Sequence, residues 1–175
     1  MFIEKAHAII NKRSEFVANV NTLLAELFAC ISGRPERWKL RYHSSLQGDP
    51  RQDVQTLARD REIQAGHALY GPHHDDFPFE FAGRQREALF SRSEFRISLL
   101  ALKLALNELL VGRAGLRPVI ILDDLYSELD ASVGERVTEY LQGLTNQIFI
   151  TTTRIPAGLQ LPDARIMEIR EGRIV

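Results

Sequence analysis

Residues 119–130, VIILDDLYSELD, decide the fold class of this chain. The apolar run at 118–122 is rich in β-branched residues and is typical of a parallel strand that is covered on both faces. Asp123 and Asp124 follow at the carboxyl end of this strand, the edge at which ligands bind in parallel α/β sheets. There, one acid can hold a magnesium ion and the next can orient a water molecule beside a γ-phosphate. The alternative is an acidic strand end that only caps the following turn.

The patterns on both sides of this stretch predict an α/β half-sheet. Apolar residues three or four apart predict one helix over residues 2–31, ended by Gly33 and Pro35. The strongest predicted helix covers 91–111, is apolar on most of its surface and is stopped by Gly112 and Gly115. The other predicted elements are a strand at 38–43, a polar helix from Pro50 to about His67 behind an Asp49 N-cap, an edge strand at 77–81 with a turn at Gly83, a helix after Asp130, a buried strand at 147–151 and two short strands within 164–175.

The bulk composition is that of an ordinary soluble domain. Of the 175 residues, 45% are hydrophobic and 26% are charged, and the formal net charge is −1, so composition names no partner and argues against a strongly basic nucleic-acid module. Cys30 is the only cysteine, which excludes an intrachain disulfide and a cysteine-rich zinc site and favours the cytosol. The apolar stretch 97–110 falls well short of the roughly 20 residues that cross a bilayer, and the N-terminus lacks a signal-peptide pattern, so we expect no membrane association.

Four motifs in order carry a resemblance to a known family. The Ser-Glu-Leu-Asp at 127–130 resembles the D-loop of ABC ATPases, which crosses the dimer interface. Residues 71–76, GPHHDD, resemble the GPHRDD motif of the RecF family, with His74 where arginine is usual. Residues 99–105 resemble that family's signature helix, 122–130 its Walker B strand and D-loop, and 149–153 its last core strand. The resemblance is clearest over 71–154.

RecF proteins are SMC-related ABC-type ATPases that dimerise around ATP, bind DNA and help recombination mediators at single-strand gaps. The resemblance therefore implies a cytoplasmic protein of DNA replication, recombinational repair and the SOS response. It implies an α/β fold: the C-terminal half of an ABC-type ATPase head, with a mostly parallel sheet flanked by helices and an attached helical lobe. We expect residues 1–70 to form this helical lobe or lever, and residues 71–175 to carry the signature helix, Walker B strand and D-loop.

Two departures from the family pattern qualify this expectation. The chain has no G-x-x-x-x-G-K-[ST] phosphate loop, so ATP and Mg²⁺ would bind only with a P-loop lobe, and we expect no ATP turnover by this chain alone. It would then be an excised piece of a longer protein, a split-gene product or a truncated remnant. The family's Ser-x-Gly-Gln-Gln-Arg signature reads SRSEFR at 91–96. Ser93 replaces a glycine and Glu94 adds a negative charge, and both changes weaken a nucleotide contact.

The resemblance also gives the candidate site residues their roles. We expect Asp124 to be catalytic, by positioning water, and Asp123 to support the magnesium of a bound nucleotide. The expected contacts to nucleotide or to a dimer partner are Ser91, Ser93, Arg96, Ser127, Asp130 and Thr153, and the possible contacts to DNA or phosphate are Arg84, Arg86 and Arg92. The expected partners are DNA, recombination mediator proteins, and either a second copy in an ATP-dependent homodimer or a P-loop-bearing partner.

Plainer alternatives stand beside these roles. Ser91 or Ser93 can be an ordinary helix N-cap, and the arginines can form a solvated face that is balanced by Glu87 and Glu94. The contiguous residues 73–76 lack the spacing of a metal site and favour a turn with Asx hydrogen bonds. For the whole chain, the alternatives are a non-catalytic scaffold or remnant that binds DNA or mediator proteins, and another ABC or SMC relative. The latter would be supported by a coiled-coil insertion, which the sequence does not show.

Overall fold

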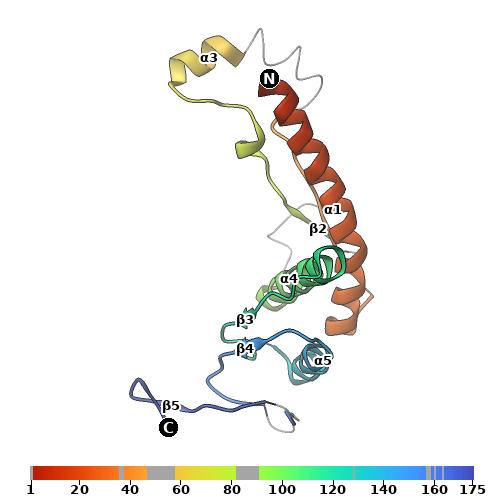
Figure 1. Cartoon of the computed structure of the whole chain (residues 1–175), viewed down its shortest axis with the longest axis vertical. Helices are drawn as coiled ribbons and strands as arrows, with labels where there is room; N and C mark the ends of the chain where they lie inside the picture. Colours follow the sequence, from red (N-terminus) through yellow and green to blue (C-terminus); the bar gives the residue numbers. More distant parts are fainter. Residues whose placement is uncertain are drawn as a thin grey trace.

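The computed structural model describes residues 2–35, 38–46, 58–81, 91–127, 129–156, 159, 161–162 and 164–175. Its longest element is α1 (Phe2–Ser32), which confirms the predicted N-terminal helix. Gly33 follows with a φ of 71°, the left-handed conformation that ends helices and suits glycine. Figure 1 shows α4 (Arg92–Ala114) crossing the C-terminal part of α1, with α5 (Ala131–Gln142) beside them.

The core forms where α1, α4 and α5 meet. Residues Glu4–Ser32 are long and apolar enough to pass as a membrane span by length and composition alone. Their apolar stripe, however, belongs to the same buried cluster as the apolar side chains of α4 and α5, which is the arrangement of a core helix. The main buried residues are Val20, Leu24, Phe28 and Ile31 of α1, Ile97, Leu100, Ala101 and Leu104 of α4, and Val133, Val137 and Leu141 of α5.

Two antiparallel strands extend this core. β1 (Trp38–Leu40) pairs with β2 (Phe79–Phe81), and the Trp38 ring packs against aromatic rings from both α1 and β2. The predicted strand at 38–43 is therefore shorter, although His43 still forms an isolated bridge with Asp76. α3 (Ala58–Ala65) lies inside the polar helix predicted from Pro50 to about His67. The predicted start of that helix, at Asp49 and Pro50, lies outside the described residues, as does the turn predicted at Gly83.

The decisive stretch forms a β-α-β unit. β3 (Ile120–Leu122) leads through α5 to β4 (Ile148–Ile150), and the two strands pair in parallel with Leu122 opposite Ile150. The apolar run at 118–122 was predicted to be a strand covered on both faces, and this prediction is wrong for the described part of the chain. Ile121 is 67% exposed and Phe149 is 45% exposed. Among the described residues, the helices cover one face of β3 and β4 and leave the opposite face uncovered.

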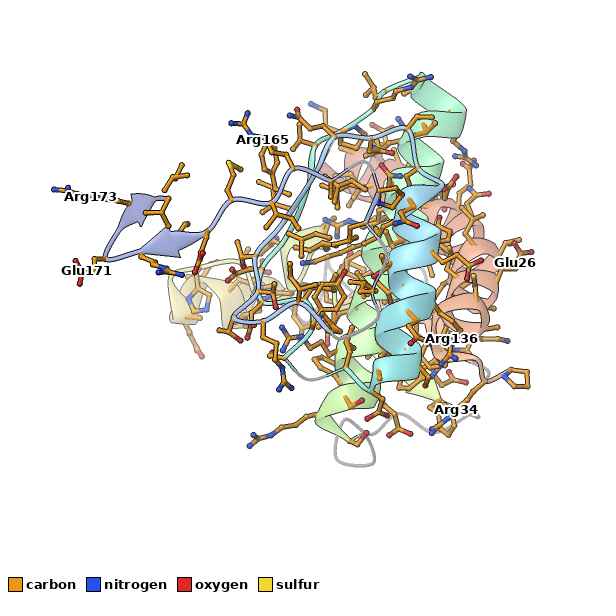
Figure 2. All side chains as sticks on the ribbon, turned by 90° about the horizontal axis from the view of Figure 1, so that it is seen from below. Glu26, Arg34, Arg136, Arg165, Glu171 and Arg173 are labelled. Atoms are coloured by element: carbon orange, nitrogen blue, oxygen red, sulfur yellow. The ribbon has the colours of Figure 1, made fainter. Side chains whose placement is uncertain are left out.

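The C-terminal hairpin agrees with its prediction, whereas the end of α4 does not. The two predicted C-terminal strands are β5 (Ile169–Arg170) and β6 (Arg173–Ile174), an antiparallel hairpin. In Figure 2 this hairpin projects from the helices, with Glu171 and Arg173 at its outer end. Gly112 does not stop α4, because the helix continues to Ala114 and only Gly115 takes the left-handed cap, with a φ of 62°. A glycine inside the last turn costs about 1 kcal/mol relative to alanine, which a well-packed helix tolerates.

Candidate functional site

Asp123 and Asp124 meet the end of β4 at the carboxyl edge of the parallel pair. Thr151 follows Ile150, and the register of the strands places it beside the two acids. Its hydroxyl donates to Oδ1 of Asp123 at 2.5 Å and accepts the backbone N–H of Asp124 at 2.9 Å. Backbone bonds from Thr151 to Leu122 and from Leu125 to Thr151 close the same turn, at 3.0 and 3.2 Å. The Thr151 side chain thus links both acids to the neighbouring strand.

Asp124 has two features that are uncommon in a residue with only a packing role. Its φ is 48°, in the left-handed region that costs non-glycine residues energy. Its Oδ1 atom is buried and has no hydrogen-bond partner within the described part of the chain. Buried carboxylate oxygens are normally satisfied, so an unsatisfied one on a strained residue marks a candidate acceptor for a ligand or water.

The start of α4 reaches the same turn through Arg96. Its Nη2 atom donates to the carbonyl oxygen of Asp124 at 2.7 Å, and more loosely to that of Asp123 at 3.4 Å. The Ser127 hydroxyl donates to the Asp124 carbonyl at 3.2 Å and lies 3.5 Å from Nη1 of Arg96. The structure therefore brings together Asp123, Asp124, Arg96 and Ser127 from the predicted set.

Ser91 is the N-cap of α4. Its hydroxyl accepts the N–H of Glu94 at 3.2 Å and donates to the Glu94 carboxylate at 2.8 Å, while the Ser91 N–H donates to that carboxylate at 3.0 Å. This is a complete capping box. These two bonds from Ser91, helped by Arg34 at 3.7 Å, hold the pKa of Glu94 below its ordinary value. The N-cap alternative is confirmed for Ser91, and Ser93 lies in the first turn that follows.

The other predicted site residues lie on the surrounding segments. Asp130 begins α5 through its carbonyl oxygen, which accepts the N–H groups of Val133 and Gly134 at 3.0 and 2.9 Å, and its side chain makes no capping bond. Thr153 and Arg92 are exposed. Arg84 and Arg86 lie outside the described residues. Thr151 was missed as a site residue, although the parallel pairing of two strands that both end in polar residues places it beside Asp123.

The GPHHDD motif forms a second polar centre around Asp75. It contains the 3-10 helix η1 (Pro72–His74). The Asp75 side chain is fully buried and pairs with Nη1 of Arg13 at 2.7 Å, across from α1. It also accepts the Tyr42 hydroxyl and, at 2.9 Å, the backbone N–H of Ser45. Burial alone would raise the pKa of Asp75, but the hydrogen bonds from Tyr42, Ser45 and Arg13 together lower it.

These contacts assign the motif a structural role in this chain. Asp75 accepts hydrogen bonds from three residues, Arg13 of α1 and Tyr42 and Ser45 of the segment after β1. The described residues contain no group of three or more His, Cys, Asp or Glu side chains that could hold a metal ion. The Asp76 carboxylate accepts the N–H of the next residue, Phe77, at 2.8 Å, whereas the Asx bond predicted for this turn would reach two residues on. A comparable contact holds the other end of α1, where Arg136 of α5, labelled in Figure 2, donates to the carbonyl oxygens of Ile31 and Ser32.

Comparisons with known proteins give the relationship of the chain. No protein-family model matches it. It is 32% identical over 186 residues to the DNA replication and repair protein RecF of Bacillus subtilis (strain 168), and 33% identical over 189 residues to that of Staphylococcus carnosus (strain TM300). Each alignment covers 99% of this chain and 50% of the relative. This chain is similar to RecF proteins along almost its entire length. It spans about half the length of the curated RecF proteins it matches.

Solved structures with a similar fold were also found. The chain superposes on the recombination mediator protein RecF-ATP with a TM-score of 0.73 and 22% identity, covering 99% of this chain and 47% of that one. It also superposes on a structure concerned with ATP-driven dimerization of SMC ATPases, with a TM-score of 0.57 and 15% identity, covering 94% and 87% of the two chains. The predicted α/β fold is confirmed, and it matches about half of the RecF-ATP structure. Among the described residues the parallel sheet is the pair β3 and β4, and the other two strand pairs are antiparallel.

Proposed function

We propose that this chain is the Walker B and D-loop half of a cytoplasmic RecF-like ATPase, which binds DNA and acts with recombination mediators in DNA replication and repair. The observation that carries the proposal is the pair of acids after β3. Asp124 keeps a buried oxygen without a partner in the described part of the chain, and the whole chain is similar to RecF proteins. The chain has no P-loop, so ATP turnover requires a P-loop-bearing half.

Asp123 fits the role of a magnesium ligand that acts with a nucleotide. Its carboxylate is exposed at the strand end and oriented by the Thr151 hydroxyl. Magnesium usually binds to one or two carboxylates together with substrate phosphates, so a single well-placed acid is sufficient when ATP supplies the other oxygens. When bound, the ion would neutralise charge on the phosphates.

Asp124 is the better candidate to position the attacking water. The free oxygen of its carboxylate can accept a proton-bearing ligand without first losing a hydrogen bond to a described residue. Hydrogen bonds to Thr151, Arg96 and Ser127 hold its backbone and so fix the point from which the side chain starts. A carboxylate that is held in this way can orient a water molecule beside a γ-phosphate, which is the role that such residues have in phosphoryl transfer.

The open face of β3 and β4 is where we place the P-loop-bearing half. Val119 is 52% exposed beside Ile121 and Phe149, and the apolar side chains of Ile169 and Ile174 in the hairpin are also exposed. Apolar surface of this kind marks an interface in a soluble protein. The occupant we propose is the remaining half of a RecF protein, because the relatives are twice the length of this chain and the RecF-ATP structure has as much chain again.

An ATP-dependent homodimer would use the residues around the start of α4. Ser91, Ser93 and Thr153 would approach the nucleotide of the partner copy, with Asp130 at the interface. Arg92, together with Arg84 and Arg86, would contact DNA or phosphate. Helix N-termini favour phosphate groups, but the Ser91 hydroxyl would have to exchange its bond to Glu94 for one to the nucleotide.

Because Ser91 would have to give up its bond to Glu94 before it could contact a nucleotide, a second candidate function is favoured. This function is a scaffold that binds DNA or mediator proteins without hydrolysis. In the described structure the Ser91 hydroxyl both donates to and accepts from Glu94, and the family's glycine is Ser93. The Glu94 carboxylate would repel the γ-phosphate that the family signature contacts. The scaffold therefore predicts binding of the P-loop half without turnover, whereas the ATPase predicts both.

The test is to mix the chain with the P-loop-bearing half of a RecF protein and to measure complex formation and ATP turnover. We expect a complex that hydrolyses ATP. Ile121→Lys should abolish the complex, because it puts a charge on the open sheet face, whereas Ile63→Lys on α3 should not, although Ile63 is 70% exposed. A complex without turnover would favour the scaffold. Failure of the unmodified chain to bind would contradict the proposed docking face.

A further inference from the structure

The backbone of Asp124 is held on both sides by side chains from other segments. Its N–H donates to the Thr151 hydroxyl after β4. Its carbonyl oxygen accepts bonds from Arg96 of α4 at 2.7 Å and from Ser127 of the D-loop segment at 3.2 Å. Three separate segments thus fix both peptide groups of one left-handed residue.

We propose that Arg96 is a positioning residue that aims the Asp124 carboxylate through its backbone carbonyl and does not contact the nucleotide. This inference rests on the proposed ATPase and revises the role first expected for Arg96. The guanidinium already reaches the carbonyls of Asp123 and Asp124 and the Ser127 hydroxyl. A planar fork of fixed donors suits this set of acceptors, which a lysine could satisfy only in part.

The need for such a brace follows from the conformation of Asp124. The left-handed conformation costs a non-glycine residue free energy, although aspartate tolerates it better than most, so contacts from the surroundings help to hold it. An unsatisfied buried carboxylate oxygen adds a further cost to the same residue. The charge-assisted bond from Arg96 is the shortest of those made to the Asp124 backbone, so it opposes relaxation of the turn most strongly.

The arrangement also couples two motifs. Arg96 belongs to α4 one turn after its Ser91 cap, so a shift of the start of α4 would change the carbonyl contact and rotate the Asp124 peptide. A phosphate bound at the Ser91 end of α4 would therefore change the orientation of the Asp124 peptide without contacting Asp124 directly. This is a positioning path through a single side chain and one carbonyl group.

The first test uses the chain alone and does not depend on ATP. We expect Arg96→Met to speed hydrogen exchange at the amides of Asp124 and Leu125 by about tenfold, as loss of a charge-assisted hydrogen bond implies. The amide of Ala101 in the middle of α4 should be unchanged. Arg113→Met, the same substitution at the exposed far end of α4, is the matched control and should leave all three amides unchanged. Unchanged exchange at Asp124 and Leu125 in Arg96→Met would overturn the proposal.

Milder variants keep this test decisive if Arg96→Met does not fold. Ser127→Ala removes the second donor to the same carbonyl and should speed exchange at the same two amides by a smaller factor. Arg96→Lys, which retains one donor, should restore part of the protection. Equal exchange in Arg96→Lys and in the unmodified chain would show that the forked geometry has no role.

The second test uses the complex with the P-loop half. We expect Arg96→Met to lower kcat by about tenfold with KM for ATP unchanged, the pattern of lost transition-state positioning. A raised KM with unchanged kcat would show a direct nucleotide contact and overturn the assignment. If the unmodified complex does not hydrolyse ATP, the proposed ATPase fails, and the exchange measurement still decides whether Arg96 braces Asp124.

Discussion

The Thr151 hydroxyl donates a 2.5 Å hydrogen bond to the Asp123 carboxylate, across the end of the parallel strand pair. The same oxygen accepts the N–H of Asp124. Thr151→Val therefore removes one donor and one acceptor while keeping the shape of the side chain. We expect it to lower the free energy of unfolding by about 0.5–1.5 kcal/mol, measured by urea denaturation, because two exposed hydrogen bonds at the turn are lost.

Thr151→Ser is the matched control for this change, since it keeps the hydroxyl and loses only a methyl group. It should lie within about 0.5 kcal/mol of the unmodified chain, because the position is exposed. Equal stabilities of the valine and serine variants would show that the hydroxyl bonds do not hold the turn.

Asp75 should be among the most sensitive polar positions in the chain. Its carboxylate is fully buried and paired with Arg13. Asp75→Asn leaves that guanidinium without its counter-charge and should cost about 3–5 kcal/mol in urea denaturation. The adjacent Asp76 is exposed, so Asp76→Asn should cost less than about 0.5 kcal/mol. Similar losses for the two variants would contradict a structural role for the first acid of the motif.

The stability of the chain should fall in acid partly because of Asp75. Its pKa in the folded protein lies below the ordinary 3.8, so the folded state binds this proton less readily than the unfolded state. The stabilisation is therefore present above pH 3.8 and is lost as the pH falls through the lower folded pKa. Urea midpoints measured across this range should decrease steeply for the unmodified chain and less steeply for Asp75→Asn. Parallel pH profiles would rule out this contribution.

The capping box at the start of α4 gives a prediction about Ser91. Ser91→Ala should lower the free energy of unfolding by about 1 kcal/mol, because the Glu94 N–H and carboxylate both lose a partner. Ser91→Thr should retain most of the stability. The comparison is made by thermal and urea denaturation of the chain alone. No loss in the alanine variant would mean that the hydroxyl does not serve as the cap in solution.

Local patterns predicted most helices and strands because they depend on the chain itself. The spacing of apolar residues in α1 and the cap at Ser91 are set by neighbours within a few residues. The exposed face of Ile121 could not be predicted in this way. A β-branched run shows that both faces of a strand are apolar, but it does not show whether the covering layer belongs to the same chain.

For the candidate site, too, local sequence patterns predicted some residues but not the contacts between segments. Asp123 and Asp124 were found from their place after an apolar strand, whereas the link through Thr151 needed the register of β3 and β4. Arg96 was expected at the nucleotide because the family signature is read that way. Its direction toward the Asp124 carbonyl depends on how α4 packs over the turn, which is a tertiary property that no local spacing encodes.

ATP turnover by the complex with the P-loop-bearing half, compared between the unmodified chain and Asp124→Asn, tests the central claim most directly. Asparagine keeps the size of the side chain and tolerates the left-handed backbone, so the variant should fold and bind. If Asp124 positions the attacking water, kcat should fall by about 100-fold or more with little change in complex formation. An unchanged turnover rate in Asp124→Asn would contradict the assignment.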